Sequence, residues 1–192
     1  MDLSLVRFEH RLSEHRPEDI ENPRLRRSAV AIVLRYERSS PDILLMKRAE
    51  REGDRWSGQI SLPGGRESDR DRDLQATAMR ETHEEVGIDL ERAARPIGRL
   101  DTIQARARGG LQPLTITPFV FVQTRVVELV LNHEAQDAFW LPFDRVVGGE
   151  LTGKYPYKIH GLPAQLPCWR YEGHVIWGLT HRILSQLIGI VE

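Results

Sequence analysis

Residues 63–88 read PGGRESDRDRDLQATAMRETHEEVGI and join a glycine pair, a charged loop and a helical pattern. The apolar residues over 74–86 recur at helical spacing, and Gly87 stands where a helix commonly ends. The side chains expected to anchor this helix to a core are Ala76, Met79 and Val86. The stretch therefore predicts a glycine turn, an exposed loop over 66–73 and a helix over 74–86.

Three carboxylates lie on one face of the predicted helix. Glu81, Glu84 and Glu85 occupy positions i, i+3 and i+4, which are neighbours on a helix surface. Like charges at this spacing repel each other. Mg²⁺ removes the conflict, because it is a hard ion that takes oxygen ligands and keeps several waters for substrate phosphates. Arg80 lies four residues before Glu84 and is placed to orient these carboxylates.

An ordinary solvated acidic helix is the alternative interpretation of the same three residues. The upstream Pro63-Gly64-Gly65 favours the metal site, because it follows a short apolar strand candidate and precedes the loop that leads to the helix. Glycine lets the backbone approach a ligand closely, and a carbonyl there can reach the same ion.

Length and composition indicate one domain with a terminal extension. The chain has 192 residues and a net charge of −1, from 27 basic and 28 acidic residues. Nothing in this balance points to a nucleic acid or an anionic membrane as partner. The chain shows no signal-type apolar region and no run of 18 apolar residues, so we expect a cytoplasmic protein. One cysteine excludes an internal disulfide.

The remaining pattern alternates strands and helices. Ala29 to Leu34 is apolar and β-branched, as in a strand buried on both faces, and Ile43 to Met46 is its expected hairpin partner. A first helix is expected over 3–15 and a last one over about 175–190. Further strands are expected at 96–103, 114–123 and 138–141. We place an N-terminal helical extension at 1–22 and the main domain at 23–192.

Residues 65–88 resemble the Nudix box, G-x5-E-x7-R-E-U-x-E-E-x-G-U, in which U is apolar. The chain departs from it in having Asp71 for the first Glu, one extra residue before the arginine, and Thr82 at an apolar position. The extra residue and the Asp are both common in the coenzyme A pyrophosphatase branch of this family. The matching positions are Gly65, Arg80, Glu81, Glu84, Glu85, Gly87 and Ile88.

This resemblance implies a Nudix fold, which is an α+β architecture (an α/β/α sandwich) with a mixed central sheet flanked by helices. It also implies Mg²⁺ or Mn²⁺ held by Glu81, Glu84, Glu85 and the Gly65 carbonyl, with Asp71 pairing with Arg80. A further carboxylate is expected from a later loop. Glu134, six residues before Trp140-Leu141-Pro142, is the candidate, with Asp137 and Glu128 as weaker ones. The predicted catalytic residues are Arg80, Glu81, Glu84, Glu85 and Glu134.

The implied reaction is hydrolysis of a pyrophosphate bond in a nucleoside diphosphate linked to another moiety. The segment before the box is similar to the coenzyme A branch at Leu44, Leu45, Arg48, Gly58 and Pro63-Gly64-Gly65, and Ile176 to Thr180 resembles it as well. The segment departs from the branch at Met46, Ala49-Glu50, Asp54 and Leu62. Coenzyme A or a derivative is the first expectation. The predicted substrate contacts are Arg48, Arg55 and Gly64, with arginine suited to paired contacts with phosphate.

Other interpretations stay open. The substrate could be a nucleoside diphosphate sugar or ADP-ribose, or the fold could be a binding module without catalysis. Trp56 or the pair Tyr155 and Tyr157 could stack on a base, with core packing as the alternative. The seven histidines show no zinc-binding spacing. A homodimer through the N-terminal helix or exposed strands is a further expectation.

Overall fold

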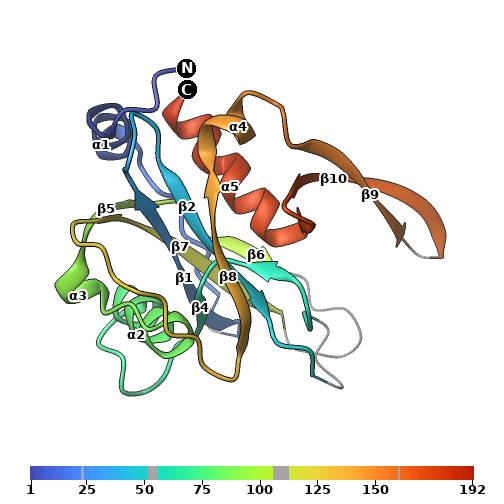
Figure 1. The fold of residues 1–192 in the computed structure, drawn as a ribbon. Helices are drawn as coiled ribbons and strands as arrows, with labels where there is room; N and C mark the ends of the chain where they lie inside the picture. Colours follow the sequence, from blue (N-terminus) through green and yellow to red (C-terminus); the bar gives the residue numbers. More distant parts are fainter. Residues whose placement is uncertain (23, 52–55, 106–112, 160) are drawn as a thin grey trace.

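The computed structural model describes residues 1–22, 24–51, 56–105, 113–159 and 161–192 (Figure 1). Two layers of helices enclose a mixed β-sheet, and a smaller sheet projects from one side. The elements in chain order are α1 (Leu5–Glu14), β1 (Arg26–Arg35), β2 (Asp42–Arg48), β3 (Ile60–Ser61), β4 (Gly64–Arg66), α2 (Leu74–Val86), α3 (Leu90–Ala93), β5 (Ala94–Arg99), β6 (Ile103–Ala105), β7 (Leu114–Gln123), β8 (Ala135–Pro142), α4 (Phe143–Val147), β9 (Thr152–Ile159), β10 (Leu162–Tyr171), β11 (His174–Trp177) and α5 (Gly178–Val191).

The strand β1 forms the centre of the main sheet. It runs parallel to β7 and antiparallel to β2 and β4, so the sheet is mixed, as the resemblance implies. The strand order is β3-β2-β1-β7-β5, with β8 beside β2 and β6 beside β7. Leu34 lies opposite Ile43, which confirms the predicted pairing of the first two apolar runs.

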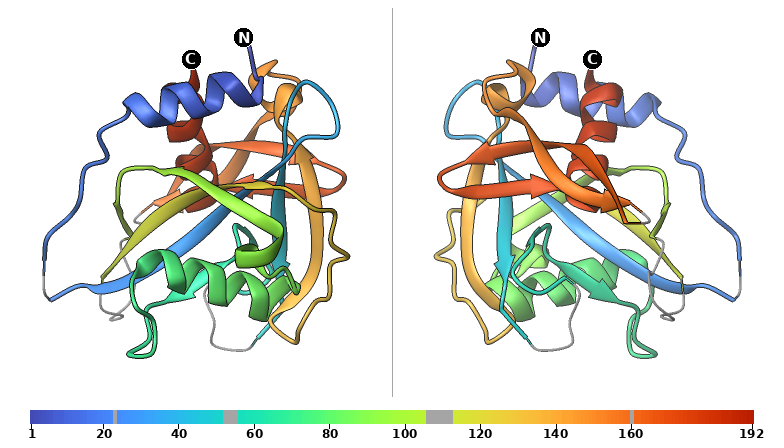
Figure 2. Two further views of the ribbon diagram at one scale, coloured as in Figure 1. Left: turned by 90° about the vertical axis from the view of Figure 1, so that its left-hand side faces the viewer. Right: turned by 90° about the vertical axis from the view of Figure 1, so that its right-hand side faces the viewer.

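Alternate side chains of β1 enter two separate cores. Ala29, Ala31 and Val33 pack in the layer that contains α2 and α3. Ile32 and Leu34 pack in the layer that contains α1 and α5. Figures 1 and 2 show α2 and α5 on opposite sides of the sheet. This arrangement is the expected α/β/α sandwich, and it explains why the run is apolar at every position.

The N-terminal helix α1 packs on the rest of the chain. Phe8 and Leu12 are buried in the same core as α5, and the Arg7 Nη2 donates to the Glu192 carbonyl at 2.6 Å. Residues 15–22, which we call the N-terminal strap, continue from α1 along the sheet. The predicted homodimer stays a prediction.

A three-stranded sheet in the order β11-β10-β9 was not predicted. Its long hairpin β9–β10 projects from the body of the molecule (Figure 1). Its base is anchored by Trp169 and Ile176, which are buried in the core with α5. The last helix was predicted from about 175, but it begins at Gly178, because residues 175–177 pair with β10 instead.

No helix within the described ranges is long and apolar enough to cross a membrane.

Candidate active site

The helix α2 spans Leu74–Val86, as predicted, because both of its ends are capped locally. The Asp73 carboxylate accepts from the Ala76 N–H at 2.7 Å and so satisfies one of the free amides of the first turn. At the other end Gly87 adopts the left-handed conformation with φ 78°.

The buried side of α2 matches the predicted one in part, because Val86 lies in the core and Met79 packs against it, whereas Ala76 does not. Ala78 and Val86 are fully buried, whereas Ala76 and Met79 are only half-buried. Thr82 lies on the buried side, and its hydroxyl donates to the Ala78 carbonyl at 2.7 Å, so a polar residue is accommodated at this apolar position of the box. The buried side of α2 thus includes Ala78, Thr82 and Val86, and Glu85 is buried with them.

The three helix carboxylates lie in different environments. The side chain of Glu85 is 2% exposed, that of Glu81 is 16% exposed and that of Glu84 is 52% exposed. Burial raises the pKa of Glu85 to about 7, and the nearby charges of Glu81 and Glu134 act in the same direction. Burial also raises the pKa of Glu81, although hydrogen bonding to Arg80 opposes the shift.

Two contacts hold Glu85 in its buried position. The Gly64 N–H donates to Glu85 Oε2 at 2.8 Å, and Arg48 Nη1 lies 3.9 Å from Glu85 Oε1. Arg48 ends β2, so the sheet itself brings a cation to this carboxylate. The predicted substrate contacts Arg48 and Gly64 therefore both lie at the glutamate cluster.

Arg80 organises the loop before α2 and the first glutamates. Its Nε and Nη2 donate to Asp71 Oδ1 and Oδ2 at 2.9 and 3.0 Å, which is the predicted pairing. Its Nη1 donates to Glu81 at 2.8 Å and to Glu84 at 3.1 Å. Hydrogen bonding to Arg80 holds the pKa of Asp71 well below its usual range.

Gly64 and Gly65 form the short strand β4 instead of the predicted turn, because they pair with Val30 and Ala29 of β1. Glycine is required at position 64, where an added Cβ would meet backbone, whereas at position 65 an added Cβ would displace the Glu81 side chain. A Cβ on Gly64 would lie 2.3 Å from the Ala29 carbonyl oxygen, and a Cβ on Gly65 would lie 2.4 Å from the Glu81 carboxylate. The glycine pair thus lets the backbone and the Glu81 carboxylate meet.

Glu134 lies close enough for its charge to raise the pKa of both Glu81 and Glu85. The Asn132 N–H donates to the Glu85 carbonyl at 3.2 Å, which ties this loop to the end of α2. The Asn132 side chain then accepts from the Glu134 N–H at 2.7 Å. Arg51 Nη1 lies 3.3 Å from the Glu134 carboxylate. Neither Arg51 nor Asn132 is among the predicted site residues, although Asn two residues before Glu134 is a turn signal.

The other sequence candidates lie elsewhere. Asp137, the weaker alternative to Glu134, pairs instead with His174 at 3.3 Å. Tyr155 stacks on Trp177 with ring centres 4.3 Å apart, and Tyr157 contacts the same ring. The predicted contact Arg55 lies outside the described residues.

The NUDIX domain model matches residues 25–162, which is more than half of the chain. The chain belongs to the Nudix family. An uncharacterized Nudix hydrolase, NudL of Cronobacter sakazakii, is 31% identical over 189 residues, which cover 96% of this chain and 93% of that protein. An uncharacterized protein of Schizosaccharomyces pombe is 35% identical over 161 residues, or 74% of this chain. The chain spans about half of its length, 49%.

Solved Nudix structures share the fold. A MutT/nudix family protein from Enterococcus faecalis matches 98% of this chain and 70% of that one, with a TM-score of 0.57 and 14% identity. The NUDIX domain of Shewanella oneidensis NrtR, solved with ADP-ribose, matches 72% of this chain and 85% of that one, with a TM-score of 0.51 and 18% identity.

The Nudix family generally uses a divalent metal such as Mg²⁺. Within the described part of this Nudix chain, no three acidic, His or Cys side chains stand ready to hold an ion together. Arg80 contacts Glu81 and Glu84, and Glu85 accepts from Gly64. The donors are nevertheless carboxylate oxygens, the type that Mg²⁺ prefers, and a cation would relieve their mutual repulsion. The residues therefore fit a hard divalent cation once Glu81 and Glu84 turn from Arg80.

Proposed function

We propose that this Nudix chain hydrolyses the pyrophosphate bond of a nucleoside diphosphate linked to another moiety. The observation that carries the proposal is the buried Glu85, whose neighbours include two further carboxylates, Glu81 and Glu134. Burying a charge beside like charges is costly unless a cation compensates it. A purely structural helix gains nothing from such a cluster.

The proposed ligands for Mg²⁺ or Mn²⁺ are Glu81, Glu84, Glu85, Glu134 and the Gly65 carbonyl. A bound divalent ion supplies charge neutralisation and lowers the pKa of an attacking water. The chain's own groups do the positioning. Arg48 brings positive charge beside the cluster, and the Gly64 N–H holds the Glu85 carboxylate in place.

A carboxylate in this cluster accepts the proton of the attacking water. A general base works best when its pKa lies near the working pH. Burial raises the pKa of Glu81, which shifts this carboxylate toward that condition. Glu81 and Glu134 are the proposed bases, because Glu85 is the more deeply buried and already accepts from Gly64.

Coenzyme A or a derivative is the proposed substrate. Support comes from the resemblance of the segment before β4 to the coenzyme A branch. Two departures from that pattern do not argue against coenzyme A. Met46 is fully buried in the core that contains α2, and Leu62 is buried in the opposite core. Neither side chain is a candidate for substrate contact. ADP-ribose or a nucleoside diphosphate sugar is the second candidate, and the fold shared with the ADP-ribose-bound NrtR domain favours ADP-ribose.

The test incubates the full chain with Mg²⁺ or Mn²⁺ and one substrate at a time, with products identified by mass. The substrates are coenzyme A, ADP-ribose, GDP-mannose, UDP-glucose and diadenosine polyphosphates. Coenzyme A is expected to give 4′-phosphopantetheine and adenosine 3′,5′-bisphosphate. Turnover of ADP-ribose in its place selects the second candidate. A chain that turns over none of them while binding one tightly is a binding module, and the proposal fails.

A further inference from the structure

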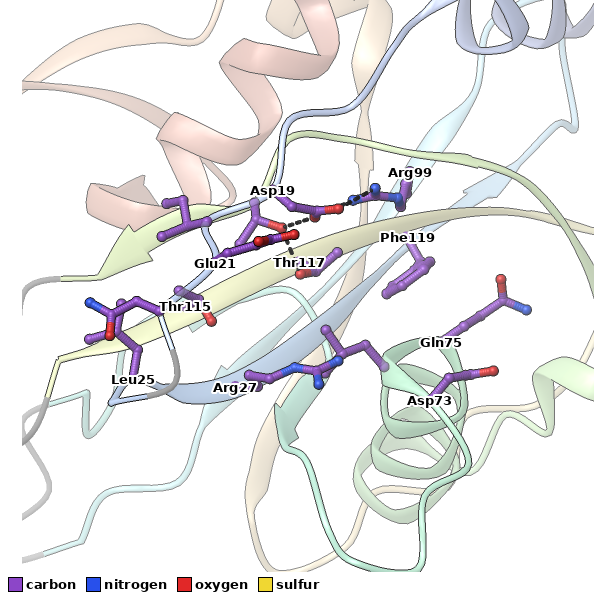
Figure 3. A pocket seen from close by; sticks show the side chains of 14 residues that line it. Asp19, Glu21, Leu25, Arg27, Asp73, Gln75, Arg99, Thr115, Thr117 and Phe119 are labelled. Atoms are coloured by element: carbon purple, nitrogen blue, oxygen red, sulfur yellow. Dashed lines mark hydrogen bonds and ion pairs between the residues drawn. The ribbon is translucent and has the colours of Figure 1, made fainter.

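A cavity of about 650 Å³ lies on the other flank of α2 from the glutamate cluster (Figure 3). The glutamates face β4, and the cavity is lined by β7, which pairs with the opposite edge of β1. Its other walls are the strap and the first turn of α2. Figure 3 shows Asp19 and Glu21 on the strap and Asp73 and Gln75 at the start of the helix, as two sides of the same lining. We call this cavity the strap groove.

The floor of the strap groove is polar although it is buried. Thr115 and Thr117 are only 4% and 3% exposed. They lie on the same face of β7 as Phe121, which is buried in the core farther along the strand. The Thr117 hydroxyl lies 2.9 Å from the Thr102 hydroxyl. Phe119 adds an aromatic ring to the same wall. Because Thr102 donates its own proton to Asp19, Thr117 donates to Thr102 and keeps a lone pair that can accept from a ligand hydroxyl.

The strap is fixed over the groove by several hydrogen bonds. Arg99 donates to both oxygens of Asp19 at 2.7 Å, and the Thr102 hydroxyl donates to Asp19 at 2.9 Å. The Thr102 N–H donates to the Glu18 carbonyl at 2.8 Å. The wall is therefore preorganised, and a ligand does not bear the entropic cost of ordering it.

The charges of the groove disfavour an anion. Both arginines that line it face a carboxylate, because Arg99 is held by Asp19 and Arg27 lies 3.4 Å from Glu67. Glu21 and Asp73 add negative charge to the lining. A phosphate placed there would meet more acidic than basic groups. Apolar side chains and the Gln75 amide suit an uncharged ring with hydrogen-bonding edges.

We propose that the strap groove binds an uncharged ligand of nucleoside size, an aromatic heterocycle that carries hydroxyl groups. Its volume lies in the range of small-molecule sites, roughly 300–1,000 Å³. The ring packs against Phe119 and the apolar walls, and the hydroxyls contact the threonine floor and Gln75. This site is separate from the glutamate cluster and does not depend on the reaction proposed there.

The test measures binding to the full, metal-free chain by calorimetry, with adenosine, guanosine, cytidine and uridine as probes. At least one is expected to bind, and its 5′-monophosphate is expected to bind at least about tenfold more weakly. Thr117→Val is expected to weaken the nucleoside at least about fivefold, the size expected for one lost hydrogen bond. Gln75→Ala, on the helix surface, replaces this variant if Thr117→Val does not fold.

Thr180→Val is the matched control, because the Thr180 hydroxyl is also buried but donates to Ile60 in the opposite layer. It is expected to leave nucleoside affinity unchanged. The proposal is overturned if none of the four nucleosides binds. It is equally overturned if Glu85→Gln weakens binding as much as Thr117→Val does, because the ligand then lies at the glutamate cluster.

Discussion

Asp71, in the loop before α2, and Glu85, on α2 itself, are two carboxylates with buried side chains. Their pKa values are shifted in opposite directions. Their side chains are 4% and 2% exposed. Asp71 accepts two hydrogen bonds from Arg80 and others from Ser68 and Thr77, and hydrogen bonding holds its pKa below the usual range. Glu85 accepts one backbone hydrogen bond, and burial raises its pKa to about 7.

The difference shows that burial alone does not determine the state of a carboxylate. A full set of donors favours the ionised form of Asp71, which joins the loop to α2. Glu85 keeps an oxygen that faces Arg48 from 3.9 Å and lies among like charges, so its anionic form calls for a cation. Incomplete compensation therefore distinguishes the proposed metal-binding residue from the structural one.

The largest expected effect is on catalysis by Glu85→Gln. Hydrolysis is expected to fall by about 10²–10³-fold, the range for loss of one preorganised electrostatic group. The melting temperature is expected to hold or rise, because the variant removes a poorly compensated buried charge. Steady-state kinetics and thermal melting measure both. Glu91→Gln, on the exposed start of α3, is the control; a rate for Glu85→Gln equal to the control's would contradict the assignment.

Alanine at the two glycines separates backbone from side-chain roles. Gly64→Ala is expected to destabilise the fold by about 2–3 kcal/mol, because its Cβ meets backbone at φ 150°. Gly65→Ala is expected to fold normally and lose about tenfold in rate, because its Cβ meets only the movable Glu81 carboxylate. Urea unfolding and kinetics measure these effects. Full activity in folded Gly65→Ala would show that the position of Glu81 does not matter.

Asp71→Asn is expected to act mainly on stability. Loss of the charge-assisted bonds to Arg80 should cost about 2 kcal/mol in the free energy of unfolding. The rate of the folded variant should fall by less than that of Glu85→Gln. Asp69→Asn, in the exposed part of the loop, serves as the control in urea unfolding. If Asp71→Asn abolishes turnover without destabilising the chain, then Asp71 is part of the reaction rather than of the scaffold.

The smallest expected effect is on stability against pH. The folded pKa of Glu85, about 7, exceeds its ordinary value of 4.5, so the folded state binds more protons between these values. The free energy of unfolding of the metal-free wild-type chain should therefore rise by about 1–2 kcal/mol from pH 7.5 to pH 5.5, relative to that of Glu85→Gln. Asp71, with its lowered pKa, contributes stability that is lost only below about its ordinary value. Equal pH profiles in the two proteins would count against a buried, perturbed Glu85.

Local signals predicted α2 well and its orientation less well. Asp73 caps the first turn with its side chain and Gly87 ends the helix in the left-handed conformation, so the bounds of α2 can be deduced from the sequence. The choice of Ala78 over Ala76 as the buried residue depends on β1, which lies far away in the chain. The Gly64-Gly65 strand likewise exists only because β1 offers it a partner.

Longer-range features escaped prediction. The hairpin β9–β10 contains Pro156, Pro163 and Pro167, which are atypical of strands and fit here in a sheet with an exposed edge. The strap groove depends on the Asp19–Arg99 pair, whose members lie 80 residues apart. Nothing in the local sequence of either residue indicates the other.

Metal binding tests the central claim most directly. Calorimetry with Mn²⁺ should show that the wild-type chain binds the ion. Asp71→Asn should bind Mn²⁺ with an affinity within about threefold of the wild-type value, and Glu85→Gln should bind it at least about tenfold more weakly. The difference is expected because Glu85→Gln removes a metal ligand, whereas Asp71→Asn removes only a scaffold contact. Equal Mn²⁺ affinity in the wild-type chain and Glu85→Gln would contradict the account, because the buried carboxylate would then have no part in holding the metal.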